Sequence, residues 1–259
     1  MASFYKPVGR CIYCGETAYS ENDLNRKLGE EHIIPLSLGG TLILPEASCQ
    51  KCEAITSRIE TACMPLYNPG RYHLGLRARK SKRERKKLPV AIGNSDNKIL
   101  VDKHRHPGVL WGFRYVIPEI LALPSPSGDE FSGNIIMAPA IPDFKERIAQ
   151  MGASVSVKVG AGVSQSFFGR FLAKIAHAHT AAEIGLGEFS PLLIDTIFGR
   201  NTPSLSWLIG SPLGQDDQPT SLFHEIKFVD LSRTYITVMV RLFPDRQLPP
   251  YYVVSGKRV

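Results

Sequence analysis

The sequence lacks any long apolar run. No stretch approaches the eighteen or so consecutive apolar residues that a membrane-spanning helix needs. The opening residues, MASFYKPVGRCIYCGE, also lack the apolar core of a secretory signal peptide. We therefore expect no membrane partner and a cytoplasmic location, where thiols stay reduced. With 43% hydrophobic and 21% charged residues, the 259-residue chain can bury a core as one large domain or two small ones.

Several signatures of common enzymes are also missing. The sequence shows no internal repeat, no spacing typical of a Ser-His-Asp triad, and no glycine-rich loop that would hold phosphate before a helix. The segment VGAGVSQS, residues 159–166, resembles a phosphate loop superficially but lacks its G-K-[ST] ending. Function must therefore be sought in the few residue clusters that the chain does contain.

Cysteine is scarce, and four of the five cysteines form two pairs. Cys11 and Cys14 lie in CIYCG, and Cys49 and Cys52 lie in CQKC, with 34 residues between the two pairs. Two C-x-x-C pairs in a cytosolic chain predict one tetrahedral zinc site, because the two-residue gap lets both sulfurs face one ion. Two disulfides, a redox dithiol and an iron–sulfur cluster are the alternatives. We expect Cys63 to be a small buried residue.

Positive charge is concentrated in one segment. Residues 71–87, RYHLGLRARKSKRERKK, hold nine lysines and arginines against one glutamate, whereas the net charge of the whole chain is only +7. Such a run favours binding to a polyanion, because each neutralised phosphate releases condensed counterions. A solvated linker without a partner is the alternative interpretation.

The first sixty residues predict a knuckle, a β-hairpin and a helix. Residues 11–15 form the knuckle, and Gly15 supplies the backbone freedom that a tight turn needs. EHIIPL (31–36) and TLIL (41–44) read as two strands joined by the turn SLGG, with Pro45 ending the second strand. A helix follows from Ser48, its expected N-cap, with Ile55, Ile59 and Ala62 on one stripe. One zinc ion would clamp the knuckle to the start of this helix.

A hairpin packed on that helix can bring Glu31, His32 and Glu53 together. His32 lies on the first strand, and Glu53 directly follows the second cysteine pair. Two carboxylates beside a histidine predict a site for Mg²⁺ or a similar hard ion. The imidazole would then be free to take a proton from water, which is the equipment of metal-assisted phosphodiester hydrolysis.

At these residues the sequence resembles the HNH endonucleases of the ββα-metal, treble-clef zinc type. The resemblance rests on CIYCG, EHIIPLSLGG and CQKCEAITSRIE together, and it covers about residues 11–60. The subgroup it resembles carries an EHIIP…GG…C-x-x-C core near the N-terminus.

The resemblance implies a role for each matching residue. Glu31 would ligate a catalytic Mg²⁺ or Mn²⁺ ion, Glu53 would be a second ligand to it, and His32 would be the general base. The cysteines Cys11, Cys14, Cys49 and Cys52 would hold a structural zinc ion that does no chemistry. DNA is the expected substrate rather than RNA, and a homodimer is compatible with the pairing that such nucleases use to cut both strands.

Two positions depart from the family pattern. An asparagine is expected near Leu44, where it braces the hairpin, but TLILPEASC contains none. The position after the last cysteine is Glu53 rather than His or Asn. These departures favour a second hypothesis, in which the region is a zinc-stabilised nucleic-acid-binding module that does not cut.

Beside a nuclease-like core, the basic run has an evident use as a grip on the phosphate backbone. The residues expected to contact nucleic acid are Arg71, Arg77, Arg79, Lys80, Lys82, Arg83, Arg85, Lys86 and Lys87.

The fold class predicted for the whole chain is α+β. We expect an HNH-like zinc module over residues 1–66, a basic arm over 67–88, and an α+β C-terminal domain over 89–259. Strands are predicted at VAIG, GFRYVIP, NIIMAPA and SVSVKVG, and a strand pair at TYITVMVRLFP and YYVVSGK.

The strongest helix signal is in residues 164–185, SQSFFGRFLAKIAHAHTAAEIG. Its polar stripe of Arg170, Lys174 and His177 is expected to be a solvated surface, with contact to nucleic acid as the alternative. The role of the C-terminal domain is left open between choosing a target and docking a ligand or partner that would switch the nuclease.

Overall fold

The computed structural model describes residues 3–76, 87–92, 98–151, 155–156, 163–200, 205–213 and 219–259. Helices and several separate sheets are mixed along the chain, which confirms the α+β prediction. Among the helices of these segments, none is both long enough and apolar enough to cross a bilayer.

The N-terminal region contains the hairpin and the helix that the sequence predicts. A three-stranded sheet has the order β1-β3-β2, in which β3 pairs with β1 in parallel and with β2 antiparallel. The strands are β1 (Ser3–Phe4), β2 (Gly29–His32) and β3 (Leu42–Ser48), and the helix that follows is α1 (Gln50–Cys63).

The hairpin differs from the prediction at its edges. β2 ends at His32 instead of continuing through Leu36, and β3 continues through Pro45 to Ser48. A register shift between β2 and β3, and a positive φ of 50° at Glu46, mark an irregularity next to that proline. Proline is tolerated in a strand at such irregular positions, so Pro45 does not end β3.

The two glycines of EHIIPLSLGG are required by the loop between β2 and β3. Gly39 ends a short 3-10 helix with a φ of +85°, a backbone conformation that favours glycine. Gly40 packs directly against the backbone of Ile34, and a Cβ atom there would lie 1.9 Å from the Ile34 carbonyl oxygen. The glycine pair therefore shapes the loop.

Helix α1 begins one residue later than predicted. Its N-cap is Cys49 rather than Ser48, so a metal-ligand cysteine also sits at the helix start. The buried stripe consists of Cys52, Thr56, Ile59 and Cys63, whereas the predicted stripe members Ile55 and Ala62 are only half-buried. Cys63 is fully buried, as expected.

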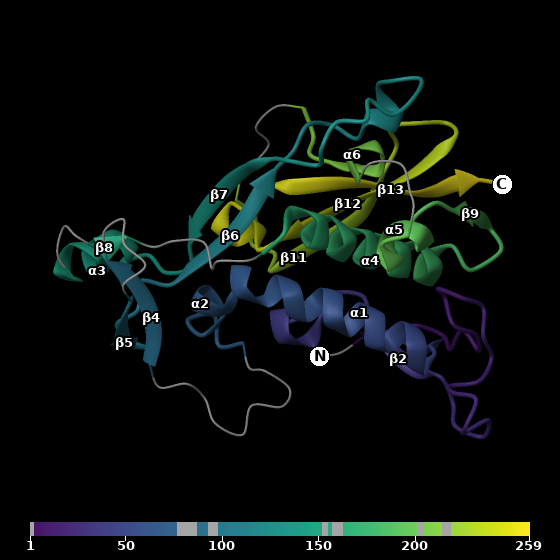
Figure 1. Cartoon of the computed structure of the whole chain (residues 1–259), viewed down its shortest axis with the longest axis horizontal. Helices are drawn as coiled ribbons and strands as arrows, with labels where there is room; N and C mark the ends of the chain where they lie inside the picture. The colour runs from purple at the N-terminus through teal and green to yellow at the C-terminus, as the bar shows by residue number, and fades with distance from the viewer. Residues whose placement is uncertain are drawn as a thin grey trace.

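The middle of the chain forms two small sheets. One has the order β5-β4-β8 and lies beside α3 at the far end of the molecule; the other pairs β6 with β7 (Figure 1). These elements are α2 (Asn68–Arg71), β4 (Lys87–Ile92), β5 (Lys98–Asp102), β6 (Val109–Arg114), β7 (Asn134–Pro139), α3 (Phe144–Met151) and β8 (Val155–Ser156).

The C-terminal part is a five-stranded antiparallel sheet covered by helices. The path β10-β13-β12-β11 runs through it, and β9 pairs with the end of β13. The predicted pairing of the last two strands is confirmed. The elements are α4 (Gln165–Glu183), β9 (Phe189–Pro191), α5 (Ile194–Phe198), α6 (Leu205–Leu208), β10 (Ile209–Gly210), β11 (His224–Val229), β12 (Tyr235–Leu242) and β13 (Pro250–Arg258).

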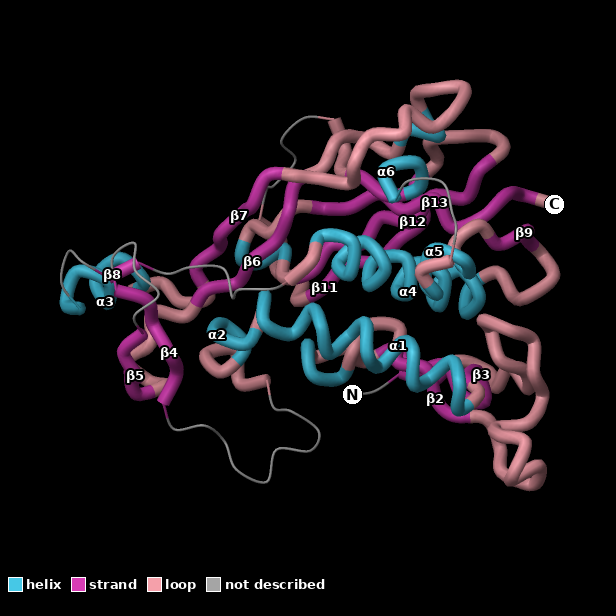
Figure 2. The backbone as a smooth tube through the Cα atoms, viewed as in Figure 1, coloured by secondary structure: helices cyan, strands magenta, loops and turns pink. Residues whose placement is uncertain are grey.

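Helix α4 lies between α1 and the C-terminal sheet (Figures 1 and 2). Because both sides of α4 are covered, its residues are buried almost all round, including Lys174 and His177 at 0% exposure. The expectation that the polar stripe of this helix is a solvated surface is therefore wrong. Lys174 and His177 find their partners in the N-terminal region, whereas Arg170 donates to the carbonyl oxygen of Ile197 on α5.

One hydrophobic core extends from Cys11 to Val254 and includes α1, α4 and the last strands. The His177 ring on α4 donates a hydrogen bond to the Ile12 carbonyl in the knuckle, and the His224 ring on β11 donates to the Leu38 carbonyl in the hairpin loop. The predicted boundary at residues 88 and 89 thus does not coincide with a break in the core.

Candidate active site and metal centre

The four paired cysteines come together as predicted. Their sulfur atoms all lie within 4.8 Å of one another, and the sulfurs of Cys14 and Cys49 are 3.6 Å apart. Tetrahedral zinc with bonds of about 2.3 Å separates its sulfur ligands by roughly 3.8 Å, so the cluster is compatible with one zinc ion. All five cysteines are free, which excludes the alternative of two disulfides.

The knuckle holds two of these sulfurs through its backbone. The amide of Gly15, with a φ of +83°, donates to the carbonyl of Cys11, and the amide of Ile12 donates to Ala47 on β3. The other two sulfurs sit at the N-cap and in the first turn of α1. The cluster therefore ties the knuckle to both β3 and the helix.

The close approach of the thiols shifts their pKa values in opposite directions. A hydrogen bond from Cys52 lowers the pKa of Cys11 to about 4, while burial raises the pKa of Cys14 to about 11. The hydrogen bond to Cys11 and the Cys11 charge also raise the pKa of Cys14. Zinc would remove this conflict, because a coordinated thiol is deprotonated by the metal.

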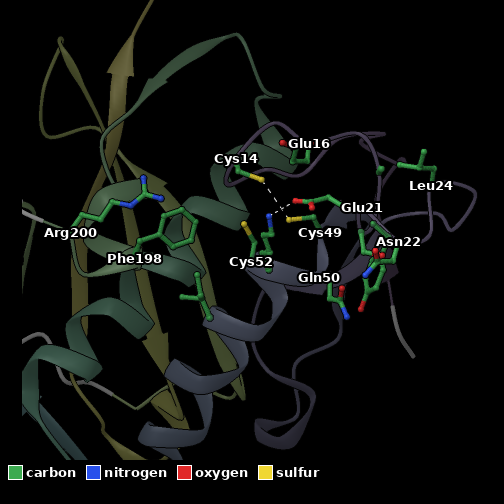
Figure 3. Close-up of a pocket in the computed structure, with 15 residues that line it drawn as sticks. Cys14, Glu16, Glu21, Asn22, Leu24, Cys49, Gln50, Cys52, Phe198 and Arg200 are labelled. Atoms are coloured by element: carbon green, nitrogen blue, oxygen red, sulfur yellow. Dashed lines mark hydrogen bonds and ion pairs between the residues drawn. The ribbon is translucent and has the colours of Figure 1, made fainter.

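A pocket of about 450 Å³ opens beside the cysteine cluster. Figure 3 shows Cys14, Cys49 and Cys52 at one wall and Phe198 with Arg200 across from them. Lys51 and Glu21 form an exposed ion pair at its rim. Neither His32 nor Glu31 lines this pocket, so it is separate from the predicted catalytic residues.

Glu31 is placed by β2 in the interior, where it meets a lysine from α4. Its carboxylate is 4% exposed, and its Oε1 lies 2.6 Å from the Lys174 ammonium. The Glu60 carboxylate, on α1, lies 2.8 Å from the same nitrogen. Lys174 also donates to the carbonyl oxygens of His32 and, at 3.3 Å, of Ile33.

Burial and charge act in opposite directions in this cluster. Desolvation raises the pKa of Glu31, although the nearby ammonium opposes the shift. Desolvation alone would lower the pKa of Lys174, but the charges of Glu31 and Glu60 outweigh it and the pKa is raised. Tyr13 lies beside the carboxylates, and burial and their charges raise its pKa well above the usual value. The lysine therefore stays protonated.

His32 is at the end of β2 and is half-buried. It pairs with Ile43 of β3, and its carbonyl oxygen is fixed by Lys174. The backbone of the proposed base is thus held from both sides. Leu44, where the family pattern expects an asparagine, is buried and lies opposite Glu31 in the β2–β3 register.

Glu53 does not join Glu31. Its side chain is exposed, and its Oε2 accepts a hydrogen bond of 2.9 Å from the Tyr19 hydroxyl. Strand β2 runs along α1, so Gly29 faces Glu53, whereas Glu31 meets Glu60. Seven residues separate the two glutamates on α1, about 10 Å along the helix axis. This offset explains why the predicted grouping of Glu31, His32 and Glu53 is not formed.

Within the described part of the chain, the four cysteines are the only group of three or more His, Cys, Asp or Glu side chains whose ligand atoms all lie within 4.8 Å of one another. Glu31 is paired with Lys174 and Glu53 with Tyr19, so a divalent ion shared by the two glutamates does not fit the residues as they are placed. Zinc at the cysteines does fit.

The predicted nucleic-acid contacts fall mostly outside the described residues. The residues concerned are Arg77, Arg79, Lys80, Lys82, Arg83, Arg85 and Lys86. Lys87 is exposed at the start of β4. Arg71 is only 5% exposed and lies beside the ring of Tyr72, so it is not presented to a phosphate backbone.

Sequence reasoning did not identify Lys174 as the partner of Glu31. The available signal was a lysine and a histidine within a helix whose other positions are almost all apolar. A buried lysine needs a carboxylate partner, but nothing local to α4 identifies that partner.

Comparison with known proteins agrees with the N-terminal geometry. Residues 11–62, about a fifth of the chain, match the family model described as HNH endonuclease. No curated protein and no solved structure matches the chain. An HNH-type region of this kind is a nuclease-like or zinc-binding nucleic-acid module. The knuckle, hairpin and helix that carry the four cysteines are therefore similar to the HNH endonucleases.

Proposed function

We propose that the protein is an HNH-type endonuclease that hydrolyses phosphodiester bonds of nucleic acid, with His32 as the general base. The observation that carries this proposal is the cysteine cluster, which fixes β3 and α1 around the Glu31–His32 pair. His32 is half-buried at the end of a strand whose backbone is held by Ile43 and Lys174. A positioned histidine of this kind is the commonest general base in enzymes.

In the proposed reaction, the His32 imidazole takes a proton from water as the water oxygen attacks phosphorus. The new bond joins that oxygen to phosphorus, the bond from phosphorus to the 3′ oxygen breaks, and the departing 3′ oxygen takes up a proton from solvent. Zinc on the four cysteines would supply only the frame. His32 alone is assigned the proton transfer.

The sequence also predicts Mg²⁺ or Mn²⁺ held by Glu31 and Glu53. Mg²⁺ commonly uses one or two carboxylates together with substrate phosphates rather than a cage made only of protein. Glu53 is exposed and compatible with such a role, whereas Glu31 is already paired with an ammonium group. A metal requirement is therefore part of what the activity assay must measure.

The proposed substrate is DNA rather than RNA, gripped through the basic run that ends at Lys87. Cytoplasmic location and a homodimer complete the proposal, and both rest on the sequence expectations above. Contacts between the basic run and the phosphate backbone would give an affinity for DNA that falls as the salt concentration rises and depends little on base sequence.

A plasmid-nicking assay tests the proposal. Wild-type protein is incubated with supercoiled DNA in Mg²⁺, in Mn²⁺ and in a chelator too weak to remove zinc from the cysteines. We expect nicking by wild type and a loss of at least about 100-fold in His32→Ala, since general-base catalysis contributes roughly 10²–10⁴-fold. Equal nicking by both proteins would overturn the role of His32.

A second function, nucleic-acid binding without cleavage, is favoured by one observation. The carboxylate that the resemblance assigns to a catalytic metal, Glu31, is buried and paired with Lys174. If neither wild type nor His32→Ala nicks the plasmid under any condition, while both retard DNA in a gel, this second function is the correct one.

A further inference from the structure

The ammonium group of Lys174 occupies a cage of oxygen atoms between β2 and α1. Two of these atoms are carboxylate oxygens, from Glu31 at 2.6 Å and from Glu60 at 2.8 Å. Two more are the backbone carbonyl oxygens of His32 and Ile33. The lysine side chain is 0% exposed, so no water competes for the ammonium protons.

This set of oxygens is of the kind that hard metal ions use. Carboxylates and backbone carbonyls are the ligands of Ca²⁺ and Mg²⁺ in proteins. The nitrogen–oxygen distances of 2.6 and 2.8 Å are well above the 2.0–2.1 Å of Mg²⁺ and closer to the 2.3–2.6 Å of Ca²⁺. The cage is therefore sized for an ammonium group or a large divalent ion.

We propose that Lys174 is the resident cation of the Glu31–Glu60 carboxylate pair and takes the place of a divalent metal ion there. Removing the ammonium group would turn the same oxygens into a Ca²⁺ site. The proposal departs from the metal assignment that the HNH resemblance implies for Glu31.

The position of α4 explains why the lysine would not yield to a metal from solution. The helix is buried between α1 and the C-terminal sheet, and Lys174 has buried neighbours on every side of the helix. Withdrawing its side chain would leave the buried Glu31 carboxylate without a cation beside the partly exposed Glu60 carboxylate, which is strongly unfavourable. A covalently attached cation is thus present at all times, whatever the concentration of free metal.

Calorimetric titration with Ca²⁺ and with Mg²⁺ tests the proposal on zinc-loaded protein. We expect no binding to wild type in the millimolar range and one equivalent of Ca²⁺ bound by Lys174→Ala, at least about tenfold more tightly than Mg²⁺. Ca²⁺ at about 100 times its dissociation constant should also raise the Tm of this variant by roughly 5–10 °C.

Two control variants identify the site. Lys174→Met removes the charge but fills the space with an unbranched apolar chain, so it should bind no Ca²⁺. Lys174→Ala combined with Glu31→Gln lacks one carboxylate and should lose the binding at least tenfold. A folded Lys174→Ala that binds no Ca²⁺ would overturn the proposal, as would binding unaffected by Glu31→Gln.

The wild-type titration decides the matter even if Lys174→Ala does not fold with or without Ca²⁺. One equivalent of either ion bound by wild type and lost in Glu31→Gln would show that a metal, and not Lys174, is the resident cation; the absence of that binding supports the proposal. Because the measurement is of binding, its outcome is independent of whether the protein cuts nucleic acid.

Discussion

Helix α1 contributes to two clusters of cation ligands, one near each end, and the clusters differ in where the cation would come from. At its start, Cys49 and Cys52 join Cys11 and Cys14 in a cluster compatible with zinc from solution. Near its end, Glu60 joins Glu31 around an ammonium group that belongs to the chain itself. The first cluster uses soft sulfur ligands, and the second uses hard oxygen ligands.

The two clusters on this helix stabilise different parts of the fold. The zinc-type cluster joins the knuckle to the start of α1, and all four of its cysteines lie within residues 11–52. The lysine cluster joins the hairpin to α4, which follows more than a hundred residues later. One therefore stabilises the module, and the other attaches it to the rest of the protein.

Removal of zinc should have the largest effect. Structural zinc contributes about 10–16 kcal/mol to the folding of small zinc modules at neutral pH. We expect one zinc per chain by elemental analysis, and we expect Cys52→Ser to lose the metal and the folded N-terminal region, measured by circular dichroism and limited proteolysis. Cys63→Ala is the matched control and should keep its zinc; loss of zinc from both variants would contradict the assigned ligands.

Breaking the lysine cluster should rank second. Lys174→Met leaves Glu31 and Glu60 facing each other without a cation, and removing one partner of a buried ion pair typically costs about 3–5 kcal/mol. Urea unfolding measures the change. Lys51→Met removes a lysine from the exposed pair with Glu21 and should leave the midpoint nearly unchanged. A loss in Lys174→Met no larger than in this control would show that the buried cluster does not stabilise the fold.

Acid should weaken the attachment of the C-terminal sheet to the hairpin loop. The His224 ring donates to the Leu38 carbonyl at 2.7 Å, and burial lowers its pKa to about 4. The neutral form is favoured in the folded state, so the stability is present above about pH 6.5 and is lost as pH falls toward 4. At about 1.4 kcal/mol per pKa unit, the loss is at most roughly 3 kcal/mol.

The free energy of unfolding, measured from pH 7 to 4, tests this expectation. His224→Asn should make the free energy of unfolding depend less on pH, whereas the same change at exposed His104 should leave its pH dependence as in wild type. Parallel profiles for wild type and His224→Asn would mean that this histidine does not sense pH.

The smallest expected effect concerns the glycines of the hairpin loop. Gly40→Ala places a methyl group against the Ile34 carbonyl, and overpacking of this kind costs about 1–3 kcal/mol. Gly128→Ala has a φ of +82° but open space, so its cost should be only about 1 kcal/mol. Thermal unfolding of both variants shows which substitution destabilises the protein more. An equal Tm shift would show that close packing at Gly40 does not matter.

The sequence predicted the local parts of the fold well. The knuckle, the hairpin, α1 and α4, and the pairing of β12 with β13 were all anticipated, because each depends on residue patterns within a short segment. Strand ends were less accurate, as at Pro45, where a local irregularity keeps the proline in β3. The C-terminal sheet order could not be derived, since it depends on contacts between distant segments.

The candidate site, like the fold, was predictable from the sequence only where it depends on a short segment. The C-x-x-C spacing by itself determined the zinc-type cluster, because two residues between cysteines set both sulfurs on one side of a turn. Only the tertiary structure decided which cation faces Glu31. That cation comes from Lys174, 142 residues after His32, and no local pattern reveals the partner of a buried charge. Its choice depends on how α4 packs between α1 and the sheet.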